Sequence, residues 1–211
     1  MPSLGSMSER QTHAMQQLES DGWTLIPGIA FGDLLEFCEE LGGRQRVTRL
    51  IARSEAEASV PSLSANHGLG QFPPHTDGAE DLEPPRYVAL WSSAIHKAAT
   101  LLYDGEDPLL DRPLFSRAWL VGVGRRRFYV VPRQTDGNCV RWRLNPDCMR
   151  PASSDDCLEE SLASFDRLPT TRVEWRSRQA LVFDNTRLLH GREALPADDR
   201  RRELMRVSVY R

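Results

Sequence analysis

The stretch FPPHTDGA, residues 72–79, decides how this sequence folds and what it can bind. It places His75 and Asp77 two positions apart, and side chains two apart in an extended chain point to the same face. A second stretch, FDNTRLLHGR at residues 183–192, supplies His190 far along the chain. Two imidazoles and one carboxylate can hold one face of a non-heme iron(II) ion and leave the other face open. His75, Asp77 and His190 are therefore the candidate metal ligands.

The His-x-Asp pattern is weak when it is taken alone, because so short a motif arises often by chance. Asp77 followed by Gly78 is also typical of a surface turn. In that interpretation His75 is simply an exposed residue beside the turn. The sequence on both sides has to decide between the two interpretations.

The chain as a whole has the size and composition of one folded unit. Its 211 residues are 40% hydrophobic and 27% charged, which is enough to bury a core. We expect residues 1–8 to be a flexible N-terminus and residues 9–211 to form a single domain. The formal net charge of −3 is spread along the chain, which argues against nucleic acid and membranes as partners. The expected partner is a small-molecule substrate, free or presented on a carrier.

The sequence favours a cytoplasmic location. No apolar stretch has the length of a transmembrane helix, and the polar N-terminus lacks the apolar core of a secretory signal. Four cysteines fall at scattered positions without a C-x-x-C pair, which favours reduced thiols over disulfides or a zinc site. They are Cys38, Cys139, Cys148 and Cys157. The sequence does not indicate the oligomeric state.

Helical and extended patterns divide the chain near residue 44. Apolar residues recur at helical spacing over residues 9–19, 33–41 and 155–168. Short β-type runs separated by Gly, Pro and Asp fill most of the remainder. The expected strands cover residues 23–26, 47–52, 86–91, 99–103, 127–131, 140–144, 172–175, 180–183 and 204–210. This pattern predicts a mainly β fold with flanking helices, a double-stranded β-helix of the jelly-roll or cupin-like barrel type.

Three blocks of the sequence resemble the taurine dioxygenase-like family of Fe(II)/2-oxoglutarate oxygenases, which also includes clavaminate synthase. The blocks are QFPPHTDGA, PPRYVALWSSAIHKAATLLYDG, and VEWRSRQALVFDNTRLLHGREALPADDRRRELMRVSVYR. Their order along the chain is more specific than any single motif. The resemblance implies that His75, Asp77 and His190 bind Fe(II), with 2-oxoglutarate as cosubstrate and O2 as oxidant.

The resemblance also implies an anchor for the distal carboxylate of 2-oxoglutarate. Family members often carry an R-x-x-x-R pattern beyond the distal histidine, and Arg202 and Arg206 match it, with Arg202 ranked first. Arg200 and Arg201 leave the register of this run open, because a solvated loop would also explain them. Thr100 matches a threonine that donates its hydroxyl to the same carboxylate, although an ordinary strand threonine is the simpler interpretation without the resemblance.

The implied activity is that of a dioxygenase, most often a hydroxylase, acting on a C–H bond of an amino-acid-derived molecule or a natural-product intermediate. Asp77 argues against chlorination, because halogenating relatives replace this acid with a small residue. Desaturation, epoxidation and ring formation stay open. Two rival functions are a jelly-roll binding protein without turnover and a cupin-like metal enzyme that does not use 2-oxoglutarate.

The substrate itself is not indicated by the sequence. The segment between Asp77 and Tyr87 is too short for a large lid, so we expect an open pocket for a bulky or carrier-held molecule. Arg206 can bind a carboxylate or sulfonate, and Trp91 is expected either in the pocket or in the core. The resemblance implies that Asn185 and Arg192, on either side of His190, brace the distal strand.

Overall fold

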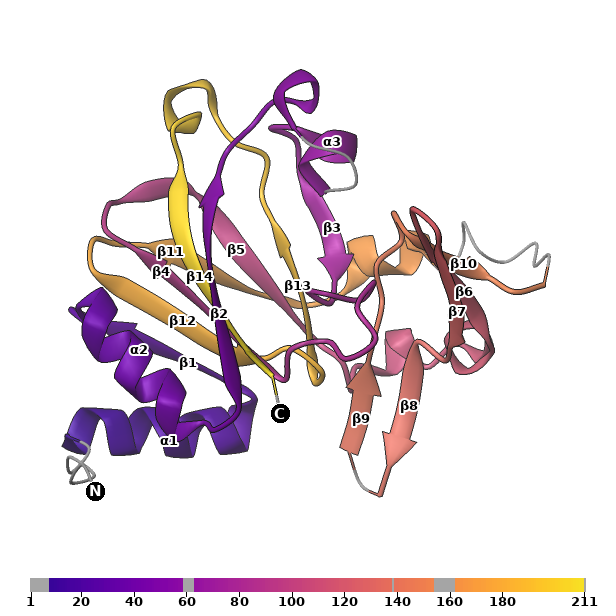
Figure 1. Cartoon of the computed structure of the whole chain (residues 1–211), viewed down its shortest axis with the longest axis horizontal. Coiled ribbons are helices and arrows are strands. Elements are labelled where there is room, and N and C mark those ends of the chain that lie inside the picture. Colours follow the sequence, from indigo (N-terminus) through magenta and orange to yellow (C-terminus); the bar gives the residue numbers. More distant parts are fainter. Residues whose placement is uncertain (1–7, 59–62, 138, 154–161, 211) are drawn as a thin grey trace.

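The computed structural model describes residues 8–58, 63–137, 139–153 and 162–210, and antiparallel strands are the main secondary structure of these residues (Figure 1). One sheet has five strands in the order β1-β12-β4-β14-β2, and a second has four in the order β11-β5-β13-β3. The strands of the first sheet are β1 (Trp23–Pro27), β12 (Gln179–Asp184), β4 (Tyr87–Ser92), β14 (Glu203–Tyr210) and β2 (Arg44–Ile51). Those of the second are β11 (Thr170–Trp175), β5 (His96–Asp104), β13 (Leu188–Arg192) and β3 (Phe72–His75).

The two sheets pack face to face, and the alternation of side chains along each strand sorts them into layers. One face of each sheet contributes to a buried cluster between the sheets, which includes Leu90, Leu102, Phe183 and Leu204. Alternate residues of each strand point into this interior. His190 lies two positions after Leu188 of the cluster on β13, so its side chain points to the same interior face.

Two helices cover the outer face of the five-stranded sheet (Figure 1). Helix α1 (Glu9–Asp21) begins with a capping box in which the Ser8 side chain and Gln11 satisfy each other's backbone N–H groups. Helix α2 (Phe31–Glu40) buries Leu34, Phe37 and Cys38 on one face. Both helices pack on small and branched side chains of β4, β12 and β14.

The segment between β5 and β11, residues 105–169, forms an insert beside the second sheet. It contains a three-stranded sheet, β10-β6-β7, and a two-stranded hairpin, β8-β9. The strands are β6 (Trp119–Val123), β7 (Arg126–Val130), β8 (Arg133–Asp136), β9 (Cys139–Trp142) and β10 (Met149–Pro151), and short 3-10 turns η2 (Pro108–Leu110) and η3 (Pro113–Ser116) precede them. The insert buries an aromatic core against the outer face of β5 and β13, which includes Phe115, Trp119, Trp142, Leu101 and Leu189.

Most predicted elements agree with the structure to within a few residues. The strands that the sequence pattern missed are β3, β6, β8, β10 and β13, in addition to the short helix α3 (Leu63–His67) and the 3-10 turns η1 (Glu55–Glu57) and η5 (Ala197–Asp199). Of the predicted helix over residues 155–168, residues 155–161 lie outside the described part of the chain. Its end is a 3-10 helix, η4 (Ser164–Arg167). The organisation of residues 9–211 as one domain stays a prediction.

The described cysteines are free, and the described helices are not of the membrane-spanning kind. Cys38, Cys139 and Cys148 are free thiols, and Cys157 lies outside the described part of the chain. Burial raises the pKa of both Cys38 and Cys148 to about 12, which keeps these thiols protonated. No helix among the described residues combines the length and apolar character that a membrane crossing requires.

Replacing Phe37 with alanine tests how much the packing of the helices contributes to stability. Phe37 is 1% exposed, so Phe37→Ala should lower the free energy of unfolding by about 3–5 kcal/mol. Urea denaturation measures this change. Tyr129→Ala is the matched control, because Tyr129 is 68% exposed and its loss should change stability by less than about 0.5 kcal/mol. Equal midpoints for the two variants would contradict this packing.

Candidate metal centre

The register of β13 against β3 brings the two candidate histidine ligands together. His190 and His75 are direct partners across this antiparallel pair, and their ring centroids lie 4.2 Å apart. Gly191 allows the close approach, because a Cβ at this position would lie 2.7 Å from the carbonyl oxygen of Phe72. Any larger residue would push the strands apart at the site.

Asp77 lies in the turn after β3, and Asn185 fixes its backbone. The Asp77 N–H donates to Asn185 Oδ1 at 2.9 Å, and Asn185 Nδ2 donates to the Asp77 carbonyl at 3.0 Å and to the Pro85 carbonyl at 2.9 Å. Asn185 itself is fully buried. Thr76 points away from the site: its N–H donates to the Leu144 carbonyl of the insert, and its side-chain Oγ1 accepts from the Leu144 N–H. The turn that carries Asp77 is thus held from two directions.

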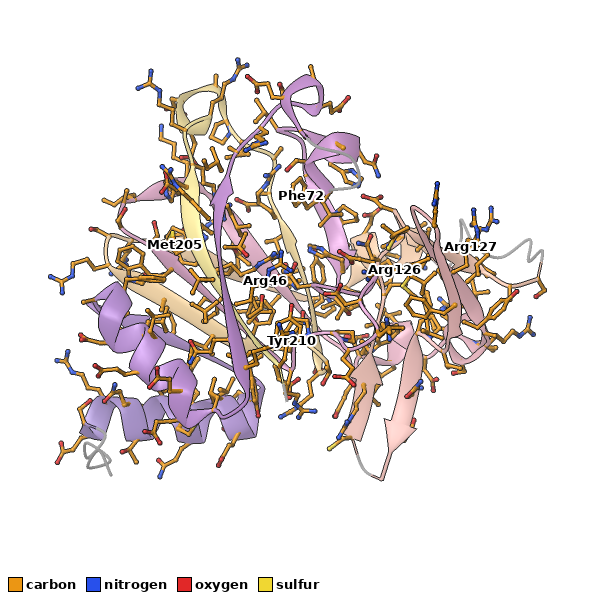
Figure 2. The ribbon with its side chains drawn as sticks, in the orientation of Figure 1. Arg46, Phe72, Arg126, Arg127, Met205 and Tyr210 are labelled. Carbon is orange, nitrogen blue, oxygen red and sulfur yellow. The ribbon has the colours of Figure 1, made fainter. Side chains whose placement is uncertain are left out.

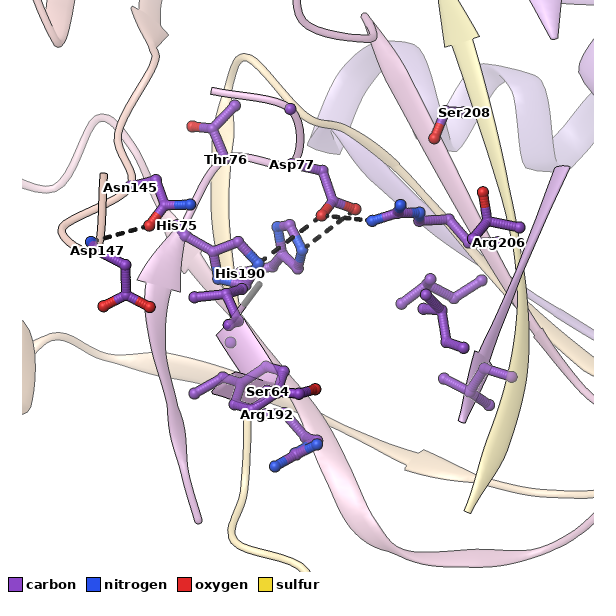
Figure 3. A pocket seen from close by; sticks show the side chains of 18 of the residues that line it. Ser64, His75, Thr76, Asp77, Asn145, Asp147, His190, Arg192, Arg206 and Ser208 are labelled. Carbon is purple, nitrogen blue, oxygen red and sulfur yellow. Dashed lines mark hydrogen bonds and ion pairs between the residues drawn. The ribbon is translucent and has the colours of Figure 1, made fainter. Parts of the chain in front are cut away.

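The three candidate ligands converge on one point (Figure 3). His75 Nε2 lies 3.9 Å from Asp77 Oδ1, and His190 Nε2 lies 3.7 Å from Asp77 Oδ2. One ligand atom from each residue lies within 4.8 Å of the other two. An ion about 2.0–2.2 Å from each donor is therefore reached by small side-chain movements. In the described part of the chain no other group of three such side chains lies close enough to hold a metal.

The protonation states suit a divalent cation. Burial lowers the pKa of His75, and burial together with the neighbouring His75 lowers the pKa of His190 to about 3. Burial alone would raise the pKa of Asp77, but the positive charge of Arg206, joined by the charges of the histidines when these are protonated at low pH, outweighs it and holds this pKa at about 2. The site at neutral pH therefore offers two neutral imidazoles and one carboxylate, as a metal requires.

Hydrogen bonds orient two of the ligands. His75 Nδ1 lies 2.9 Å from the Pro73 carbonyl, so Nδ1 carries the proton and Nε2 is free to bind a metal. Arg206 Nη1 donates to Asp77 Oδ1 at 2.8 Å. This ion pair occupies one carboxylate oxygen and leaves Oδ2 for an ion. The contact gives Arg206 a direct part in positioning Asp77.

The predicted cosubstrate anchor lies in the same cavity as the ligands. Arg202 is buried, with Nη2 3.5 Å from Thr100 Oγ1 and with no partner for Nε among the described residues. Thr100 also accepts a hydrogen bond from Trp175 Nε1 at 3.1 Å. Burial lowers the pKa of Arg202 to about 10. Arg200 and Arg201 are exposed, so the solvated interpretation holds for these two residues.

A cavity of about 670 Å³ opens onto the metal centre. Its walls come from β2, β3, β14, the turn after Asp77 and the insert. Arg46 of β2 and Phe72 of β3, both labelled in Figure 2, line the cavity. The insert contributes Val123, Asn145, Asp147 and Cys148.

Comparison with solved structures identifies the fold. Asparagine oxygenase in complex with Fe(II), 2S,3S-3-hydroxyasparagine and succinate is 15% identical, with a TM-score of 0.69 over 95% of this chain and 78% of that chain. PvcB of Pseudomonas aeruginosa, an Fe, alpha-ketoglutarate dependent oxygenase from an isonitrile synthetic pathway, is 19% identical, with a TM-score of 0.66 over 95% and 79%. The non-heme iron oxygenase OrfP, in complex with Fe, succinate and (3S)-hydroxy-L-Arg, is 15% identical, with a TM-score of 0.67 over 94% and 78%.

The chain has the fold of the Fe(II)/2-oxoglutarate-dependent oxygenases. This result confirms the predicted jelly-roll class. No family model matches the sequence, and no curated protein matches it either.

Within this oxygenase fold, several residues outside the metal centre also have defined places. Trp91 lies in the core under the helices and not in the cavity, because its Nε1 donates to the Ile29 carbonyl and its ring packs 5.4 Å from Phe31. The pocket interpretation of Trp91 is therefore wrong and the core interpretation is correct. His67 pairs with Asp147, and His96 with Asp199.

The contact made by Asn185 differs from the expected one. The sequence resemblance implied that Asn185 braces the distal strand. In the structure its side chain instead binds the backbone N–H and the carbonyl of Asp77. The dipeptide Asp184-Asn185 signals a turn, and that signal explains Asp184, whose Oδ1 accepts from the Thr186 and Arg187 N–H groups. Nothing local in the sequence indicates the partner of Asn185, because Asp77 is distant along the chain.

Replacing Asn185 with alanine should weaken metal binding while leaving all three ligands in place. Loss of its hydrogen bonds frees the turn that carries Asp77, and such supporting contacts are typically worth about 10–100-fold in metal affinity. Anaerobic calorimetric titration of the metal-free protein with Fe(II) measures this change. His190→Ala gives the reference for loss of a ligand. Asn66→Ala is the matched control, since Asn66 is an exposed asparagine on the cavity wall, and an equal loss of affinity in this control would contradict the assigned contact.

Proposed function

We propose that this protein is a non-heme Fe(II)- and 2-oxoglutarate-dependent dioxygenase that oxidises, most simply hydroxylates, a C–H bond of a small amino-acid-derived molecule. One observation carries the proposal. The buried His75 and His190 and the partly buried Asp77 line the same cavity as the buried Arg202 and its hydrogen-bond partner Thr100. The fold of known oxygenases of this class supports the same conclusion.

The ligand set fits iron(II), because two neutral imidazoles from adjacent strands and one carboxylate from the turn after β3 are the donors that hold one face of such an ion. Bound there, iron(II) would supply the redox chemistry by which O2 oxidises 2-oxoglutarate and a substrate C–H bond. His75 and His190 would hold the ion through Nε2, and Asp77 would hold it through the oxygen that Arg206 leaves free. The near-complete burial of both histidines keeps bulk water away from them.

Arg202 supports 2-oxoglutarate as the cosubstrate. A buried guanidinium without a carboxylate partner is costly, and an entering carboxylate would remove that cost. Thr100 Oγ1 lies at the same place and can donate to that carboxylate as well. A cupin-like metal enzyme that does not use 2-oxoglutarate would have no need of this pair, and a binding protein without turnover would not need the metal ligands.

Two observations support an amino-acid-derived substrate. Neighbouring structures contain hydroxyasparagine and hydroxyarginine. The cavity of about 670 Å³ has the size typical of sites for drug-sized ligands, so it can hold a cosubstrate and an amino-acid-sized molecule together. Presentation of the substrate on a carrier and a cytoplasmic location stay predictions from the sequence.

Anaerobic titration tests the proposed function directly. Addition of 2-oxoglutarate to the Fe(II)-loaded protein should produce the weak charge-transfer absorption band of the chelate. Admission of O2 should then release succinate even without the substrate. The band and the succinate should both be absent in His190→Ala, which lacks a ligand. A folded wild-type protein that shows neither signal would refute the proposal.

Replacing Arg202 separates this function from its rivals. Arg202→Ala should weaken 2-oxoglutarate binding by about 10–100-fold, the value of a charge-assisted hydrogen bond to a buried group, while Fe(II) affinity stays unchanged. Arg201→Ala is the matched control, because Arg201 is an exposed neighbour in the same run. Unchanged 2-oxoglutarate affinity and turnover in Arg202→Ala would favour a metal enzyme that uses another oxidant system.

A further inference from the structure

A second buried guanidinium, that of Arg192, lies in the cavity close to Arg202. Arg192 follows His190 by two positions on β13, so its side chain projects to the same interior face. It is the direct cross-strand partner of Thr100 on β5, and Thr100 is the residue that Arg202 contacts. Arg192, Thr100 and Arg202 thus meet at one end of the cavity, all of them less than 10% exposed.

The surroundings of Arg192 fix its guanidinium but do not neutralise it. Nη2 donates to the carbonyl oxygens of Gly68 and Gly70, with the Gly68 bond at 3.0 Å, and Nε donates to the Glu193 carbonyl at 3.3 Å. The guanidinium carbon Cζ lies over the Phe72 ring, 3.7 Å from its centroid. These partners are all uncharged. The arrangement holds a planar cation in one orientation at the cavity wall.

The charge of this pair is uncompensated in the described part of the chain. Neither guanidinium forms an ion pair with a carboxylate there, and the two positive charges repel each other. The charge of Asp199 raises the pKa of Arg202, but the Asp199 oxygens accept from Lys97 N, Ala98 N and His96. Two neighbouring buried cations without a carboxylate partner of their own are unfavourable, and a bound anion would relieve the repulsion.

We infer that Arg192 is a second cationic contact for the distal carboxylate of the cosubstrate and selects a dicarboxylic 2-oxo acid over a monocarboxylic one. The inference rests on the proposed function. Arg192 lies on the opposite side of the two histidines from Asp77 (Figure 3), so an oxo acid held at the metal ligands can extend toward it. Two cations favour a full carboxylate over a methyl group much more than one cation does, because a methyl group leaves both unpaired.

The test compares two oxo acids of equal length, 2-oxoglutarate and 2-oxovalerate, which has a methyl group in place of the distal carboxylate. Their dissociation constants are measured anaerobically on the Fe(II)-loaded full chain from the charge-transfer band. Arg192→Gln should weaken 2-oxoglutarate binding by about 10–100-fold and leave 2-oxovalerate binding unchanged. Arg192→Lys, which keeps the charge, should retain most of the affinity for 2-oxoglutarate. Arg192→Met, which can still pack on Phe72, is a second variant that removes the charge.

A matched control separates the charge of Arg192 from its hold on the loop at residues 68–70. Gly70→Ala disturbs the same loop, because its Cβ would lie 2.9 Å from the His67 carbonyl oxygen, but it keeps both arginines. The inference is wrong if Gly70→Ala reproduces the effect of Arg192→Gln, or if Arg192→Gln weakens both oxo acids equally or neither of them. A wild-type protein that binds Fe(II) but neither oxo acid would instead refute the proposed function, and the inference with it.

Discussion

The antiparallel pairing of β13 with β3 is the constraint on which the site depends. It sets His190 directly opposite His75, and the opposed pair fixes where a metal can lie before any other residue is considered. A shift of one residue in this register would turn one histidine out of the interior, because neighbouring side chains on a strand point to opposite faces. Gly191 and the carbonyl of Pro73 preserve the register and the ring orientation at this point. The remaining parts of the site are arranged around this pair.

The same pairing divides the cavity into two ends with different charges. Near Asp77, Arg206 forms an ion pair with the carboxylate. Near Thr100, the guanidinium groups of Arg192 and Arg202 have only neutral hydrogen-bond acceptors among the described residues. An anion is thus attracted to one end and a cation to the candidate ligands, which is the arrangement of charges in a complex of a metal with a dicarboxylate. A bound carboxylate would compensate the two buried cations.

Much of the fold could be predicted from the sequence, because short runs of apolar and β-branched residues between turn residues are a local property. The strands β4, β12 and β14 each contain such a run, and each agreed with its prediction. Strand β3 was missed because Pro73 and Pro74 interrupt its pattern, although an edge strand tolerates them. Strand β13 is short and follows a turn closely, and its identity comes from pairing on both sides with β3 and β5.

The candidate ligands could be named from residue type and spacing together with the family resemblance, and the resemblance also singled out Arg202 and Arg206. The contacts of Asn185 and Arg192 could not be predicted, because each depends on a carbonyl at least 100 positions away along the chain. Long-range polar contacts of this kind leave no periodic signal in a sequence. They become visible only when the topology is known.

The hydrogen bonds between Thr76 and Leu144 tie the insert to the turn that carries Asp77, and Arg143 adds bonds to the carbonyls of Ala79, Asp81 and Leu82. The insert also supplies Asn145 and Asp147 to the cavity wall. In the proposed function, the barrel carries the residues for metal and cosubstrate, whereas the insert lines part of the remaining cavity. Exchange of residues 105–169 would therefore change the cavity wall without replacing the candidate ligands, but it would also remove the contacts that hold the turn of Asp77. A transplanted insert has to reproduce these few contacts with residues 76–82, because without them the turn that carries Asp77 would lose part of its support.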